Sequence, residues 1–107
     1  MLKNTLVVVA GEFGRTPRIN QVKGASPGRQ HWPFCYSAIL AGGGIRGGMV
    51  YGESDKIGAY VKDKPVRPED FSATIYHALG VSPESRLTKD GVSKPLSTGQ
   101  PILELFG

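Results

Sequence analysis

The fold expected for this chain depends on residues 5–14, which read Thr5-Leu-Val-Val-Val-Ala10-Gly-Glu-Phe-Gly14. The apolar part holds three consecutive valines and does not alternate with polar residues, a pattern typical of a strand buried on both faces of a parallel sheet. Two glycines around one acid follow it, and open α/β sheets place their ligands at the carboxyl ends of parallel strands. The stretch therefore predicts an α/β fold with Leu6–Ala10 as an interior strand and a site directly after it.

The rest of the sequence extends this stretch into a single partial domain over residues 1–107. Its expected parts are a strand (5–10), a site loop (11–33), a second strand (34–41), a Gly-rich turn (42–48), a helix (68–79) and an irregular tail (84–107). The helix has the clearest signals, because Pro68 opens it, two acids occupy its first turn and Gly80 follows its last turn. One helix cannot cover both faces of a sheet, so a second copy (a homodimer) or a missing N-terminal portion is expected to complete it.

Composition excludes several classes of protein. The chain has 107 residues, of which 39% are hydrophobic and 21% charged, as in an ordinary globular domain. Its one cysteine excludes a disulfide scaffold. The longest apolar run, Leu6–Ala10, is far shorter than a membrane span. Met1–Asn4 lacks the basic region and long apolar stretch of a signal peptide.

Charge is distributed unevenly along the chain. Residues 1–50 carry six bases and one acid, a net charge of +5, whereas residues 51–107 carry seven bases and eight acids, a net charge of −1. The basic half suits an anionic partner. Its bases are spaced singly and no aromatic residues alternate with them, which argues against nucleic acid. A small anion such as phosphate or sulfate fits this pattern better.

Two residues have side chains that suit a metal. Glu12 follows the apolar strand between two glycines, where backbone can approach a ligand and a carboxylate can bind a hard cation; the alternative is a solvated turn residue or a helix-capping acid. His31 lies in the long loop and carries the commonest nitrogen ligand of zinc; the alternative is a histidine hydrogen-bonded to backbone. Two ligands do not complete a site, so any divalent metal (zinc, manganese, calcium or magnesium) would need others.

Arginines accompany these two residues. Arg15 and Arg29 are the candidates for binding an anion, because a guanidinium can hold phosphate or sulfate with two parallel hydrogen bonds. The alternative is surface solubility, which is the ordinary role of any single arginine. The proximity of Arg15 to Glu12 in the sequence makes it the stronger of the two candidates.

Five motifs occur in an order that matches a known family. They are Gly11-Glu-Phe-Gly-Arg-Thr-Pro-Arg-Ile-Asn20, Gly28-Arg-Gln-His-Trp-Pro33, Leu40-Ala-Gly-Gly-Gly-Ile-Arg-Gly-Gly48, Val50-Tyr-Gly52 and Pro68-Glu-Asp-Phe-Ser-Ala-Thr-Ile-Tyr-His-Ala-Leu-Gly80. In these motifs the chain resembles the C-terminal part of the DUF1501 family, sulfatase-like proteins of the alkaline phosphatase superfamily that are common in bacteria. The resemblance covers nearly the whole chain.

The resemblance implies a fold and a chemistry. The fold is an α/β/α sandwich with a mostly parallel sheet, and the chemistry is metal-dependent attack on phosphate or sulfate esters by a Ser, Thr or modified Cys nucleophile. Glu12 takes the place of an acidic metal ligand and His31 that of a later histidine ligand. Phe13 stands where a histidine is usual and Gln30 where an aspartate is usual, and no residue of the chain corresponds to the nucleophile. Full-length relatives resemble exported proteins.

Two functions follow from this sequence. The first is a fragment of a metal-dependent phosphate or sulfate ester hydrolase that is inactive on its own. The second is a non-catalytic module that binds an anion or a protein partner through its basic N-terminal half.

Overall fold

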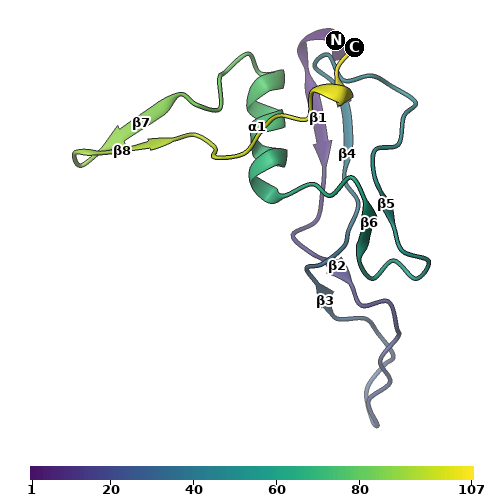
Figure 1. Ribbon diagram of the computed structural model, residues 1–107. Coiled ribbons are helices and arrows are strands. Elements are labelled where there is room, and N and C mark those ends of the chain that lie inside the picture. Colours follow the sequence, from purple (N-terminus) through teal and green to yellow (C-terminus); the bar gives the residue numbers. More distant parts are fainter. The chain divides into compact units, whose positions relative to one another are not determined.

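The structure, a computed structural model shown in Figure 1, describes residues 1–107. The chain divides into two compact units. Unit 1 consists of Met1–Val7, Leu40–Met49 and Val66–Gly107, and unit 2 consists of Val8–Ile39 and Val50–Pro65. The chain contains one α-helix, two short 3₁₀ helices (Leu2–Asn4 and Leu103–Leu105) and four separate two-stranded sheets. None of these helices combines the length and the apolar character that a membrane-spanning segment requires.

The sheets differ from the expected architecture. β1 (Leu6–Val9) pairs with β4 (Ile39–Gly42), and neither strand has a second neighbour. The other three pairs are antiparallel. The structure has no parallel sheet and no α/β/α sandwich, so the predicted fold class is wrong.

The apolar strand itself explains the difference. Val7, Val8 and Val9 are 41%, 37% and 56% exposed, so residues on both faces of β1 are open to solvent. A parallel strand is buried only when neighbours flank it and helices cover both faces of its sheet. The run of valines specifies a strand locally, but the chain has a single helix with which to cover it.

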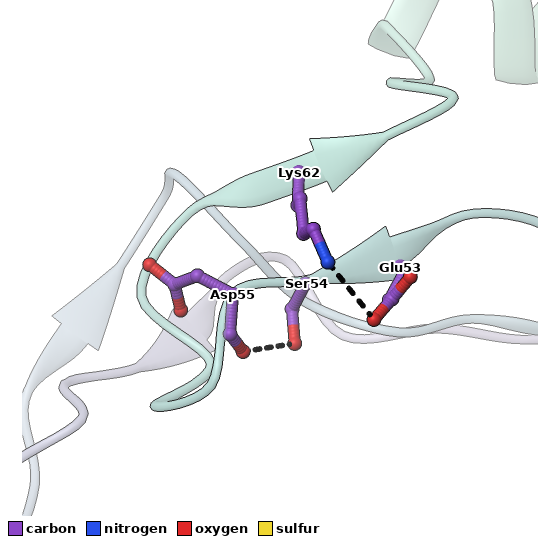
Figure 2. A network of polar contacts seen from close by, with 4 residues as sticks. All are labelled: Glu53, Ser54, Asp55 and Lys62. Atoms are coloured by element: carbon purple, nitrogen blue, oxygen red, sulfur yellow. Dashed lines mark hydrogen bonds and ion pairs between the residues drawn. The ribbon is translucent and has the colours of Figure 1, made fainter.

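Unit 2 is built on two antiparallel pairs. β2 (Gly14–Arg15) pairs with β3 (His31–Trp32), and β5 (Glu53–Ser54) pairs with β6 (Val61–Asp63) through an irregular register. The Lys62 Nζ lies 3.6 Å from Glu53 Oε1, which makes an exposed ion pair across β5 and β6. The Ser54 hydroxyl donates a hydrogen bond to the carbonyl of Asp55, and Figure 2 shows both contacts. The Asp55 carboxylate accepts hydrogen bonds from the backbone N–H groups of Ala59 and Tyr60, which closes the connection between the two strands.

An aromatic cluster forms the packed part of unit 2. The rings of Trp32, Phe34 and Tyr60 lie with centroids 4.9–5.7 Å apart, at separations that favour edge-to-face contact. The Trp32 indole N–H donates to the carbonyl of Ala59, which is itself buried. The cluster therefore joins the end of β3 to the segment between β5 and β6.

In unit 1 the helix α1 runs from Pro68 to Ala78, with Leu79 as its C-cap. Pro68 occupies its first turn together with two acids, and Gly80 adopts a φ of +75° directly after the cap, where glycine tolerates the left-handed backbone. The sequence predicts a helix over 68–79, one residue longer.

The segment that follows α1 differs from the irregular tail expected over 84–107. β7 (Arg86–Lys89) and β8 (Val92–Pro95) form an antiparallel hairpin (Figure 1). Asp90 and Gly91 both have positive φ, as a two-residue hairpin turn requires. The Arg86 side chain donates hydrogen bonds to the hydroxyl and the carbonyl of Ser93, and these bonds across β7 and β8 stabilise the hairpin.

Polar contacts fasten residues 97–102 to α1. The Ser97 hydroxyl donates to the carbonyl of Glu69, and the Asp70 carboxylate accepts a hydrogen bond from the N–H of Gln100. Thr74, only 1% exposed, donates from Oγ1 to the carbonyl of Asp70 at 2.7 Å and accepts from the N–H of Ile102 at 3.0 Å. One buried hydroxyl thus joins the helix to the C-terminal segment.

We expect Thr74→Val to destabilise unit 1 by about 2 kcal/mol, because the isosteric side chain leaves the part-buried N–H of Ile102 without its partner. Chemical unfolding followed by helical circular dichroism measures the change. Ser72→Ala is the matched control, since the Ser72 hydroxyl is exposed and bonds only to the carbonyl of Pro68 within the same helix. Equal effects of the two substitutions would show that the bond to Ile102 contributes nothing.

The accessible surface of the chain is large for its mass. It is 8330 Å², whereas a compact protein of this mass exposes about 5,800 Å², and two separate compact units of half that mass expose about 7,000 Å². The excess holds however the two units are arranged. Large apolar side chains contribute to it, among them Val9, Val50, Ile39 and Leu87. The chain therefore leaves apolar surface uncovered that a further polypeptide can bury.

Candidate functional site

The candidate site is a hollow of about 240 Å³ in unit 2. It is lined by Gly11, Glu12, Phe13, Arg15 and His31. The first three belong to the loop between β1 and β2, Arg15 lies on β2 and His31 on β3. A single strand pair thus brings an acid and a guanidinium that are close in sequence together with an imidazole 16 or more residues further along the chain.

The register of the strand pair explains this arrangement. Arg15 and His31 are direct partners across β2 and β3, and partners in an antiparallel pair project their side chains to the same face. The pairing continues past the strands to Thr16 and Gln30. The Thr16 N–H donates to the carbonyl of Gln30, and the Gln30 N–H donates to the Thr16 hydroxyl. Thr16 thereby fixes the register that brings Arg15 opposite His31.

Gly14 permits the close approach of this pair to the segment that follows it. A Cβ at Gly14 would overlap the carbonyl oxygen of Cys35 and lie 3.0 Å from that of Trp32. Neither oxygen belongs to a flexible side chain, so only glycine fits here.

Phe13 forms one wall of the hollow. Its ring stacks on the imidazole of His31, with centroids 5.1 Å apart and an angle of 26° between the planes. The phenyl ring has no metal-binding atom, so at the position where the resemblance places a histidine this chain provides packing for His31. The sequence did not indicate this role, which depends on the pairing of β2 with β3.

The charged groups at the hollow are largely unpaired. Glu12 is exposed and makes no hydrogen bond or ion pair within the chain. Arg15 makes one hydrogen bond, from Nη1 to the carbonyl of Arg29 at 3.4 Å, which leaves its other N–H groups free. Arg29 is not among the lining residues, and its carbonyl accepts the hydrogen bond from Arg15.

The donor set does not fit a resident metal ion. Glu12 and His31 carry suitable atoms, but no group of three or more His, Cys, Asp or Glu side chains gathers anywhere in the chain. Catalytic zinc takes at least three protein ligands. The guanidinium of Arg15 also lines the hollow and repels a cation. None of the lining residues carries a hydroxyl or a thiol, so the hollow also lacks a nucleophile of the Ser, Thr or Cys type.

The chain was compared with protein-family models, curated proteins and solved structures. A family model described as "Protein of unknown function (DUF1501)" matches residues 1–106. No curated protein and no solved structure matches the chain.

Proposed function

The chain belongs to the DUF1501 family, and from this premise we propose that it contributes one side of the active site of a phosphate or sulfate ester hydrolase. The proposed class is the sulfatase-like class of the alkaline phosphatase superfamily, and the chain corresponds to the C-terminal part of such a protein. Arg15 binds the oxyanion, and Glu12 and His31 face the position of a metal. On its own the chain does not hydrolyse esters.

The observation that carries this proposal is the convergence of three side chains on one hollow. Glu12, Arg15 and His31 line it together, although the first and last are 19 residues apart in sequence. Hydrolases of oxyanion esters combine a guanidinium, which binds the anion, with oxygen and nitrogen ligands, which bind a divalent ion. Because two donors do not hold a metal, the remaining ligands and the nucleophile have to come from outside residues 1–107.

The uncovered apolar surface supports the same proposal. β1 is apolar and exposed on both faces, and the chain exposes more surface than compact units of its mass. Further polypeptide, either a second copy or the N-terminal portion of the same protein, can cover β1 and bring the missing ligands to the hollow.

We expect the isolated chain to show no submicromolar binding of zinc or manganese in calorimetric titration. Two protein ligands leave most of the ion's coordination shell to water, and tight sites need closed coordination. Any weak binding should decrease in His31→Gln. His77→Gln is the matched control, because His77 lies on α1 and packs edge-on against Phe106, both in unit 1, whereas the hollow lies in unit 2. Submicromolar binding, or binding that depends on His77, contradicts the assignment.

We expect the isolated chain to hydrolyse no ester. A hydrolysis assay tests this, with 4-nitrophenyl phosphate and 4-nitrophenyl sulfate as substrates and each candidate divalent metal added in turn. Turnover by the wild-type chain that is lost in Glu12→Gln would show that the chain holds a complete active site. The hydrolase assignment itself is tested by phenyl phosphate binding, which millimolar Mg²⁺ should strengthen in the wild type and not in Glu12→Gln, because Mg²⁺ binds phosphate together with carboxylate oxygens.

One observation favours a second candidate, a non-catalytic module that binds an anion or a protein partner. Arg15, Arg18 and Arg29 make no ion pair in the structure, so the basic half keeps its positive charge available. A module of this kind binds phenyl phosphate to the same extent with and without Mg²⁺, which separates it from the hydrolase site.

A further inference from the structure

We propose that the hollow selects phosphate over sulfate, because Glu12 accepts a hydrogen bond from the proton of a phosphate P–OH group while Arg15 donates to the other oxygens. This inference rests on the proposed function, since it names which of the two ester classes the same site takes. It uses only side chains of this chain and involves no metal.

The first step is that the acid and the base at the hollow do not neutralise each other. Glu12 and Arg15 both line it, yet no ion pair joins them. The Glu12 carboxylate has no partner in the chain, and Arg15 uses one of its five N–H groups on the carbonyl of Arg29. A ligand that enters the hollow therefore meets free donors from one side chain and free acceptors from the other.

The second step concerns the chemistry that satisfies both groups. An ionised carboxylate only accepts hydrogen bonds, so it needs a donor on the ligand. Sulfate and sulfate esters carry no proton near neutral pH, and their oxygens would face the Glu12 oxygens as like charges. Inorganic phosphate keeps at least one P–OH group at neutral pH, and a phosphate monoester keeps one near its second pKa of about 6.

The third step explains how the site distinguishes phosphate from sulfate: sulfate leaves the Glu12 carboxylate without a hydrogen-bond partner. A polar group placed to bond with one ligand discriminates against an analogue that lacks the matching atom, because that analogue gives it no hydrogen bond and here places negative oxygens against the carboxylate. Arg15 binds both anions through the same geometry and does not distinguish them. The discrimination therefore resides in Glu12, and its removal should abolish the preference without abolishing binding.

The test is a pair of titrations of the ¹⁵N-labelled full chain with sodium phosphate and with sodium sulfate, in metal-free buffer at pH 7 and constant ionic strength. Amide shifts of residues 11–15 and 31 report occupancy of the hollow. We expect phosphate to bind about tenfold more tightly than sulfate, the lower end of what a hydrogen bond to a charged group supplies. In Glu12→Gln the ratio should fall to about one, with sulfate affinity increased because the like charge is gone.

Two controls keep the result specific to the hollow. Glu84→Gln removes the same charge at an exposed residue in unit 1 and should leave the ratio unchanged. Arg15→Gln should weaken both anions equally, whereas Arg18→Gln, whose residue does not line the hollow, should weaken neither. Equal affinities of phosphate and sulfate in the wild type, or a ratio that survives Glu12→Gln, overturn the inference. The dependence of phenyl phosphate binding on Mg²⁺ is a separate measurement, so the proposed function can fail while this inference holds, and the reverse.

Discussion

Replacing Gly99 by alanine is expected to destabilise unit 1 by about 3 kcal/mol, the upper part of the range for overpacking a filled site. A Cβ at this position would overlap the carbonyl carbon and oxygen of Glu69 and the backbone nitrogen of Asp70. These atoms belong to the first turn of α1, so they cannot move without disturbing the helix. The same carbonyl of Glu69 accepts the hydrogen bond of Ser97, which the displacement would break.

Urea unfolding followed at the helical circular dichroism band measures this effect, since α1 is the one α-helix of the chain. Gly47→Ala is the matched control. Gly47 belongs to the same unit, has no positive φ, and a Cβ there meets nothing within 4 Å. A loss in Gly99→Ala no larger than the loss in Gly47→Ala would mean that the contact between α1 and residues 97–102 is loose.

The helix is the part of the fold that the sequence predicts best, for a physical reason. Its beginning and end depend on neighbouring residues, namely Pro68 in the first turn and Gly80 after the cap. The hairpin over 86–95 is also local, and its signal is the Asp90–Gly91 pair between two short extended runs. The proline and glycine residues of 84–107 favour an irregular tail, and the two-residue turn shows that the local Asp90–Gly91 signal decides the structure there.

The sheet was mispredicted because strand pairing is not local. The composition of Leu6–Val9 indicates a strand, and β1 is one. The absence of alternation indicates that both faces are apolar, and it does not indicate whether anything covers them. The expectation of a buried parallel strand assumed neighbours and helices that residues 1–107 do not contain.

The candidate site depends both on local sequence signals and on strand pairing, which is not local. Residue type and position after a strand single out Glu12 and Arg15, whereas the position of His31 beside them requires the register of β2 and β3. That register follows from the Thr16 and Gln30 hydrogen bonds, which no spacing rule reveals. Arg29 precedes β3; its carbonyl accepts a hydrogen bond from Arg15, and Arg29 does not line the hollow. The functional roles of these residues remain predictions.

Replacing Gly14 by alanine should disrupt the candidate site more than any change to its charged residues, with a cost of about 3 kcal/mol to unit 2. The added Cβ would overlap the carbonyl oxygen of Cys35 and press on the carbonyl of Trp32, so β2 has to separate from the segment that follows β3. Separation removes Arg15 from its position opposite His31 and displaces Phe13 from the imidazole.

Two readouts follow this change independently. Trp32 is the only tryptophan of the chain and the direct strand partner of Gly14, so its fluorescence should shift to the red as the indole gains solvent. Phosphate binding, measured by the amide shifts of residues 11–15, should be lost together with the hollow. Gly28→Ala is the control, because a Cβ at Gly28, in the same unit and without positive φ, meets nothing within 4 Å. If Gly14→Ala retained wild-type fluorescence and phosphate affinity, the pairing of β2 with β3 would not be what assembles Glu12, Arg15 and His31 into one site.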